Sequence, residues 1–259
     1  MLVGSTGSGK STLIDGMINY ITDVSWEDDL RFSLIDITQD EKKNCGDETK
    51  SQTEWITTYR VPWCYEGELR YSLNIIDTPG FGDTRGIEKD KYIISQVNQL
   101  FHAKGENGIQ LIDAVCFVTQ SPLVRLTPSQ NYIFDSILAM FGKDISSNIF
   151  VLITFADGKT PPVLDALHKA NVPFNSSFKF NNSALFEPNN EVSKDKFAKC
   201  FWKMGEESFK LFFSGLDSVE TKSLQLTKEV LRTRMTLEVT IEGLQKQVTV
   251  GMNQLNTIR

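Results

Sequence analysis

A phosphate-binding loop near the start of the chain is the strongest chemical signal in the sequence. The residues that match G-x-x-x-x-G-K-[ST] are Gly4, Ser5, Thr6, Gly7, Ser8, Gly9, Lys10 and Ser11. In such a loop the glycines let backbone N–H groups turn toward a phosphate, the lysine reaches the β- and γ-phosphates, and the last hydroxyl binds Mg²⁺. A segment with helical periodicity begins at Thr12, and its positive N-terminal end would face the same phosphate. We therefore predict that these residues and Thr12 bind a nucleoside triphosphate.

A second motif, Asp77-Thr78-Pro79-Gly80, follows a stretch of alternating apolar residues at 69–76. An aspartate at the end of a strand can hold Mg²⁺ together with the hydroxyl of a phosphate-binding loop. The amide of Gly80 would donate to the γ-phosphate. Two fixed residues are weak evidence alone, and a Pro-Gly turn is the other interpretation. Their place after a phosphate-binding loop, a long polar loop and a hairpin favours a phosphate sensor, with Ser11 and Asp77 as metal ligands.

Hydrophobic periodicity along the rest of the chain predicts an alternation of strands and helices. The expected elements are a hairpin (54–61 and 69–76), a long polar loop before it (23–50), helices at 87–103, 127–142, 161–170 and 193–214, and strands at 112–119, 148–153 and 178–180. Right-handed crossovers between such units give a mostly parallel sheet. We predict an α/β fold: a P-loop NTPase three-layer sandwich with one antiparallel edge strand, followed by a C-terminal helical extension. Only Leu2-Val3 precede the loop, which indicates an abbreviated or truncated first strand.

Composition excludes several classes of function. The net charge of −6 argues against nucleic acid as the main ligand. The four cysteines form no C-x-x-C pair, so neither a zinc site nor a disulfide framework is indicated, and we expect reduced thiols in a cytoplasmic protein. His102 and His168 lie in predicted helices with no carboxylate or cysteine constellation around them. No apolar run approaches the length of a transmembrane segment.

The last part of the chain differs in character from the rest. Apolar residues recur at spacings of three and four over about four heptads, with Arg234 and Gly251 in two of the seam positions. The apolar seam residues are Val230, Leu237, Ile241, Leu244, Val248, Leu255 and Ile258. We expect residues 1–215 to form a nucleotide-binding domain and residues 216–259 an amphipathic, coiled-coil-like helix that docks on its own domain, on a second copy, or on sequence beyond the chain.

The ordered set of motifs resembles the translation-factor-related GTPases over residues 2–186. Within it, the segment from Asp77 to Asp83 resembles the septins. Arg125-Leu126-Thr127, followed by a helix ending at Phe141-Gly142, is similar to the immunity-associated and chloroplast import GTPases. The resemblance to this septin-like group implies GTP or GDP with Mg²⁺ as the bound cofactor.

Base recognition is implied by two further motifs of the resemblance. In the family an aspartate in N/T-K-x-D accepts hydrogen bonds from guanine, and Asp157 and Thr154 match the aspartate and the first position. Phe155 stands where the family has lysine, so stacking of its ring would replace the alkyl stem. Ser183 and Ala184 resemble the motif that contacts the guanine carbonyl oxygen. The other interpretation of Asp157 is an ordinary Asp-Gly turn.

Hydrolysis lacks an obvious catalytic residue. Ras-like enzymes orient the attacking water with a glutamine after the D-x-x-G motif, and this chain has Phe81 there. Several residues are candidates for assisting hydrolysis. Thr53 is the candidate for the metal-binding switch threonine, with Thr49 as the alternative. The other candidates are Arg85 beside the sensor and a residue of a partner subunit. Arg85 also fits an ordinary solvated loop arginine.

We expect a GTP-binding protein that hydrolyses GTP slowly to GDP and phosphate and acts as a nucleotide-dependent switch or assembly module. Its partners would be a guanine nucleotide and a second copy, through the GTPase domain or the C-terminal helix. Two alternatives stay open: a scaffold that binds GTP without hydrolysing it, which Phe81 favours, and an ATP-dependent enzyme, which Phe155 motivates.

Overall fold

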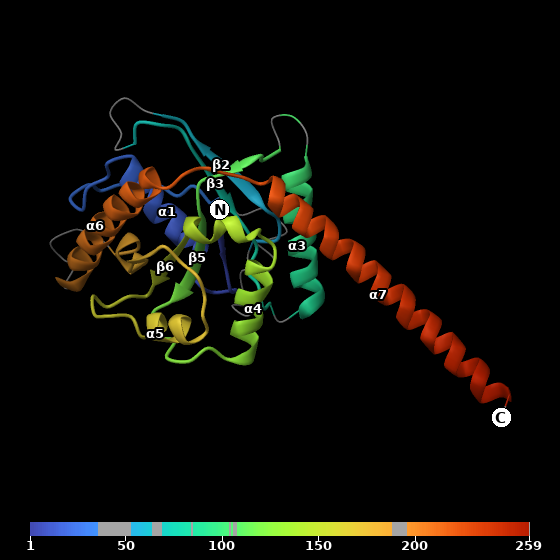
Figure 1. The fold of residues 1–259 in the computed structure, drawn as a ribbon. Coiled ribbons are helices and arrows are strands. Elements are labelled where there is room, and N and C mark those ends of the chain that lie inside the picture. The colour runs from blue at the N-terminus through green and yellow to red at the C-terminus, as the bar shows by residue number, and fades with distance from the viewer. Residues whose placement is uncertain are drawn as a thin grey trace.

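A six-stranded sheet forms the centre of the molecule (Figure 1). The structure is a computed structural model that describes residues 1–35, 53–63, 69–83, 85–103, 105, 108–187 and 196–258. The strands are β1 (Leu2–Gly4), β2 (Thr57–Val61), β3 (Leu73–Asp77), β5 (Val115–Gln120), β6 (Ile149–Thr154) and β7 (Ser176–Lys179), in the order β2-β3-β1-β5-β6-β7. β2 is antiparallel to β3, and every other neighbouring pair is parallel. The predicted fold class, a mostly parallel sheet with one antiparallel edge strand, is confirmed.

Helices cover both faces of the sheet, because the buried strands are apolar on both sides. On one face, α1 (Lys10–Ile21) and α6 (Lys196–Ser218) pack against alternate residues such as Leu2, Cys116 and Leu152. On the other face, α3 (Ile87–His102), α4 (Pro128–Leu138) and α5 (Pro162–Lys169) pack against the intervening residues, among them Val3 and Phe117. The three layers place the carboxyl ends of β1, β3, β5 and β6 at one edge, where the predicted motifs lie.

Local sequence accounts for several element boundaries. Thr127 caps α4: its Oγ1 accepts a hydrogen bond from the backbone N–H of Gln130, and the Gln130 side chain accepts one from the Thr127 N–H. Pro128 occupies the first turn, where its missing N–H costs nothing. The predicted start of this helix is therefore confirmed, although α4 ends at Leu138 and Gly142 instead begins the short 3₁₀ helix η2 (Lys143–Asn148).

The strand predicted at 112–119 is two strands in the structure. β4 (Leu111–Ile112) leaves the central sheet and pairs antiparallel with β8 (Lys222–Ser223), whereas β5 joins the sheet at Val115. The Asp113 backbone carbonyl accepts a hydrogen bond from Asn148 Nδ2, and its carboxylate accepts one from Thr221 Oγ1. The polar Asp113 thus marks the break, and the prediction of one continuous strand was wrong.

The polar loop predicted after α1 is held against that helix over its described part, residues 23–35. Asn19 exchanges two hydrogen bonds with the Phe32 backbone, and Asp15 Oδ1 accepts from the Leu34 N–H at 2.7 Å. The rest of the loop, including Thr49 and Cys45, lies outside the described residues, as does the segment 64–68 between the two strands of the predicted hairpin, which includes Cys64.

The C-terminal helix α7 (Gln225–Ile258) is docked at its start and extends away from the body thereafter (Figure 1). Leu224 and Leu231 are buried in the main core, and Thr227 Oγ1 accepts a hydrogen bond from the Gly142 N–H. Asn98 of α3 donates to Met235 Sδ. From Met235 to Val250 every residue is exposed, including the seam residues Leu237 and Leu244.

No helix among the described segments combines the length and the hydrophobicity that crossing a bilayer requires.

We predict that Leu231→Ala and Leu237→Ala will differ sharply in stability. Leu231 is 1% exposed, so its truncation leaves a cavity and should lower the free energy of unfolding by about 2–5 kcal/mol. Leu237 is 56% exposed on the same helix, and its truncation should change that free energy by about 0.5 kcal/mol or less in dilute protein. Urea unfolding followed by circular dichroism measures both, and equal losses would mean that the start of α7 is not docked.

Candidate functional site

The phosphate-binding loop joins β1 to the N-terminus of α1, as its sequence predicts. Gly7 and Gly9 have φ values of 73° and 85°, in the left-handed region that disfavours other residues. Gly9 is the residue before the first turn of α1, and its side-chain-free backbone leaves the free N–H groups of that turn open toward the loop. The arrangement forms a concave backbone surface with positive potential, which suits an anionic phosphate.

Lys10 is buried at the base of this loop. Its Nζ donates to the carbonyl oxygens of Gly4 at 3.2 Å and Ser5 at 3.0 Å. Burial lowers the pKa of Lys10 to about 8, while the nearby negative charge of Asp77 opposes this shift. The ammonium group is therefore held in place by the loop itself and has limited hydration, so it can offer a strong interaction to a phosphate.

The sensor loop after β3 lies directly against the phosphate-binding loop. The Phe81 N–H donates to the Gly4 carbonyl at 3.1 Å, and the Thr6 N–H donates to the Phe81 carbonyl at 2.9 Å. A Cβ atom at Gly80 would lie only 2.6 Å from Thr6 Cα. Only glycine fits at position 80, which explains physically why the motif requires it.

Phe81 serves the core rather than the phosphate site. Its side chain is 0% exposed and belongs to the main hydrophobic cluster with Ile133 and Val97. The backbone of Phe81 contacts the phosphate-binding loop, while its ring points into the core.

The two described candidates for catalytic help lie beside the sensor loop. Arg85 donates to Asp83 at 2.7 and 2.9 Å and to Glu54 at 2.6 Å, and these bonds raise the pKa of its guanidinium. Arg85 is thus engaged in ion pairs rather than solvated freely. Thr53 precedes Glu54, so this network brings the segment before β2 close to the sensor loop.

Two side chains at the ends of β5 and β6 form hydrogen bonds to the phosphate-binding loop. Gln120 Nε2 donates to the Gly7 carbonyl at 2.9 Å. Thr154 Oγ1 lies 2.7 Å from the Ser8 carbonyl and 3.2 Å from the Thr119 carbonyl, to either of which it can donate. Thr154 was predicted as part of the base motif, whereas Gln120 was not; a polar residue at the end of a buried parallel strand was the only signal for it.

Phe155, the residue after Thr154, adopts an unusual backbone conformation. Its φ is 53°, its side chain is 57% exposed, and its ring borders the phosphate-binding loop, with Cε2 3.8 Å from the position of a Cβ at Gly9. A bulky residue with positive φ is strained and persists where its surroundings fix it. The ring is therefore displayed beside the loop rather than folded into the core.

The two predicted base-contacting loops are joined by one side chain. Asn181 Nδ2 donates to the Ala156 carbonyl at 3.0 Å, and Asn181 Oδ1 accepts from the backbone N–H and the hydroxyl of Ser183. Asn181 therefore holds the segment of Asp157 beside Ser183 and Ala184. Asp157 itself accepts a hydrogen bond from the Lys159 N–H through Oδ1, which is the geometry of an Asp-Gly turn. The turn and a role in base recognition are compatible, because a carboxylate accepts several hydrogen bonds.

The residues present fit a magnesium ion. Asp77 is 1% exposed at the end of β3, close enough to Lys10 to affect its pKa, and Ser11 is in the first turn of α1. One carboxylate and one hydroxyl, completed by phosphate and water oxygens, match the hard ligands and the few protein contacts that Mg²⁺ takes. Elsewhere in the described chain, no group of three or more His, Cys, Asp or Glu is placed to bind a metal.

Comparison with known proteins finds similar sequences for the N-terminal part of the chain. Residues 1–107 match the Septin family model, which covers both the phosphate-binding loop and the sensor loop. Residues 1–107 are septin-like. Human Septin-4 is 31% identical over 112 residues, which is 42% of this chain and 20% of Septin-4; human Septin-5 is 32% identical over 112 residues and 26% of its length. The septin-like match thus spans about a quarter or less of these relatives.

Solved structures of similar shape come from the chloroplast import GTPases. Toc33 from Arabidopsis thaliana in complex with GDP and Mg²⁺ has a TM-score of 0.46 and 15% identity, over 79% of this chain and 82% of that one. A structure of the translocon components atToc33 and psToc159 has a TM-score of 0.49 and 13% identity, over 80% and 81% of the two chains.

We predict that the buried charge of Lys10 makes stability depend on pH. Between pH 8 and about pH 10.5 the unfolded chain keeps the Lys10 proton and the folded chain releases it, so the free energy of unfolding should rise with pH by up to about 1.4 kcal/mol per unit. Lys10→Met lacks this group. The free energy of unfolding of wild type minus that of the variant, measured in urea, should be constant below pH 8 and become more positive above it. A difference that does not change up to pH 10.5 would show that Lys10 is not buried as a charged group.

Proposed function

We propose that the chain binds GTP or GDP with Mg²⁺ at the edge of the sheet where β1, β3 and β6 end. The observation that carries this proposal is the packing of a complete phosphate-binding loop, with a buried lysine, against a sensor glycine. The septin-like sequence of residues 1–107 supports it. The proposed division of the chain is a nucleotide-binding domain at 1–215 and a helical extension at 216–259.

Each residue of the site has a role in this proposal. The loop from Gly4 to Ser11 surrounds the phosphates with backbone N–H groups, Thr12 contacts the nucleotide from the first turn of α1, and Lys10 contacts the β- and γ-phosphates. Ser11, Asp77 and Thr53 hold Mg²⁺, which neutralises charge on the phosphates. The Gly80 N–H donates to the γ-phosphate and reports its presence to the sensor loop.

The base would lie between the loops that Asn181 joins. Asp157 accepts hydrogen bonds from the N1–H and the amino group of guanine, which adenine cannot supply. Ala184 donates its backbone N–H to the guanine carbonyl oxygen, and Ser183 shapes the same loop. The exposed ring of Phe155 stacks on the base from the side of Gly9. An ATP-dependent enzyme remains the weaker alternative, since stacking alone does not distinguish the purines.

We infer slow hydrolysis of GTP. The Phe81 ring is in the core, and the guanidinium of Arg85 is paired with Asp83 and Glu54. Arg85 would have to leave both partners to reach a phosphate, so neither of these two described side chains is available to stabilise the transition state. A second copy could supply one. A scaffold that keeps GTP without hydrolysis is the second candidate, and the buried Phe81 favours it.

We further propose that α7 pairs with the α7 of a second copy. Its seam residues Leu237, Ile241, Leu244 and Val248 are all more than half exposed in the single chain, and every residue from 235 to 250 is exposed. Burying one such stripe against its equal is the common way to stabilise an extended helix. A homodimer or higher oligomer would follow, and GTP binding would act on it as a switch or an assembly factor.

Calorimetric titration tests base specificity. Wild-type protein should bind GDP with Mg²⁺ much more tightly than ADP. Asp157→Asn should weaken GDP binding by roughly 100-fold and leave ADP binding unchanged, because only guanine uses the carboxylate. Asp135→Asn, the same change at an exposed position of α4, is the control and should behave as wild type. Equal binding of GDP and ADP, unaffected by Asp157→Asn, would reject the guanine assignment.

Helix pairing has a separate test. Leu244→Glu places a charge in the seam, and Val239→Glu places the same charge on the opposite side of α7, where Val239 is 71% exposed. Sedimentation velocity across a concentration series should show association for wild type and Val239→Glu and its loss for Leu244→Glu. If the partner completes the site, the single-turnover rate of GTP hydrolysis should rise with concentration in the same two proteins. Association that survives Leu244→Glu would exclude the seam as the contact.

A further inference from the structure

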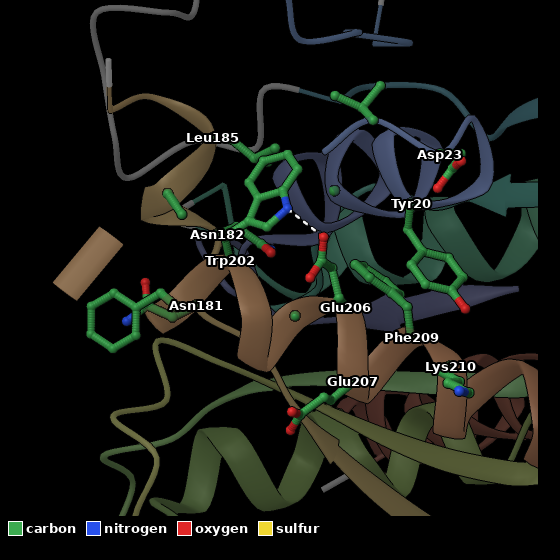
Figure 2. Close-up of a pocket in the computed structure, with 15 residues that line it drawn as sticks. Tyr20, Asp23, Asn181, Asn182, Leu185, Trp202, Glu206, Glu207, Phe209 and Lys210 are labelled. Carbon is green, nitrogen blue, oxygen red and sulfur yellow. Dashed lines mark hydrogen bonds between the residues drawn. The ribbon is translucent and has the colours of Figure 1, made fainter. Parts of the chain in front are cut away.

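A pocket separate from the phosphate site opens between α1, the 3₁₀ helix η3 (Asn182–Leu185) and α6 (Figure 2). Its volume is about 310 Å³, at the lower end of the range for small-molecule sites. No residue of the phosphate-binding loop and none of Phe155, Ala156 or Asp157 lines it. A ligand here would therefore not occupy the phosphate-binding loop, although Ala184 of the proposed base site also lines the pocket.

Aromatic rings form much of the wall. Tyr20 comes from α1, while the neighbours Phe201 and Trp202, and Phe209 about two turns later, come from α6. Trp202 and Phe209 are buried, and Tyr20 packs against Phe209 with ring centroids 5.5 Å apart. The rings are thus held by the fold, and together they give this part of the pocket an apolar wall.

The charge at the pocket is negative. Three carboxylates, Asp23, Glu206 and Glu207, line it against one cation, Lys210. Trp202 Nε1 donates to Glu206 Oε1 at 2.7 Å, which fixes this carboxylate between the Trp202 and Tyr20 rings, as Figure 2 shows. A fixed carboxylate next to aromatic faces selects for positive charge and against phosphates.

The chain already pairs one of these rings with a cation. The guanidinium of Arg31 lies 4.2 Å from the centre of the Trp202 ring and 5.7 Å from that of Trp26. Its N–H groups donate to four backbone carbonyls, among them Trp26 and Asp28, so Arg31 is committed to this position. The same indole therefore stabilises a cation on its face and orients a carboxylate at its N–H edge.

We propose that this pocket binds a small organic cation: an amine or guanidinium group carried on an apolar arm. The cationic group pairs with Glu206, and the arm packs on Tyr20, Trp202 and Phe209. Asn182 and Ala184 also line the pocket, so its occupant touches the loop whose other side is proposed to contact the base. The site goes beyond the proposed nucleotide binding and does not depend on it.

A matched pair of probes tests the charge requirement. Phenethylamine and 2-phenylethanol share the same ring and arm, and only the amine is charged. Calorimetric titration of the whole chain should give a dissociation constant on the order of 1 mM or below for the amine and at least a tenfold weaker one for the alcohol. The amine should also shift the ¹⁵N–¹H signal of the Trp202 indole, assigned by its loss in Trp202→Phe.

Glu206→Gln tests the residue. A glutamine oxygen keeps the hydrogen bond from Trp202 and removes the charge, so the amine should bind about tenfold more weakly while the alcohol is unaffected. Glu229→Gln, the same charge change at an exposed position of α7, should bind as wild type. No saturable binding of phenethylamine, equal binding of the two probes, or equal effects of the two variants would overturn the proposal.

Discussion

The close approach of two backbones is the constraint on which the site depends. The phosphate-binding loop and the sensor loop exchange hydrogen bonds between Gly4, Thr6 and Phe81, and the space between them excludes a Cβ at Gly80. Neither loop could reach this geometry with a larger residue at position 80 or without positive φ at Gly7 and Gly9. The buried ring of Phe81 then anchors the pair in the core. Packing between the two backbones therefore shapes the proposed phosphate site.

Three polar side chains connect the phosphate-binding loop and the loops of the proposed base site to the strand ends. Gln120, Thr154 and Asn181 each follow or end a strand, and each bonds a backbone carbonyl of a neighbouring loop. Each of these bonds pairs a loop carbonyl with a side chain from a strand end, so the bonds fix the relative position of the loops. The strained backbone of Phe155 lies between two of these hydrogen bonds, one from Thr154 to Ser8 and one from Asn181 to Ala156.

The sequence predicted the parts that depend on neighbours in the chain. The phosphate-binding loop, the Thr127 cap and the parallel sheet follow from contiguous motifs and periodicity, and the structure has them. It did not predict that Leu111–Ile112 would leave the sheet, because their partner strand lies more than 100 residues later. Asn181 and Gln120 were missed for the same reason. Each side chain donates a hydrogen bond to a backbone carbonyl that is distant in sequence and comes near only when the chain folds. The heptad pattern predicted the α7 seam but not that its first turns are buried around Leu231.

α3 contacts both the sensor loop and α7. At one end, Asp90 accepts a hydrogen bond from the Gly82 N–H; farther along, Asn98 contacts Met235, and Lys91 feels the charges of Glu238 and Glu242. The 23 residues from 236 to 258 extend about 35 Å at 1.5 Å per residue, so a tilt of about 10° at their base displaces the tip by about 6 Å. This part of α7 extends from the body of the molecule, and the buried Leu231 anchors the helix at its start. Any rotation of the first turns of α7 would therefore be magnified along its exposed part.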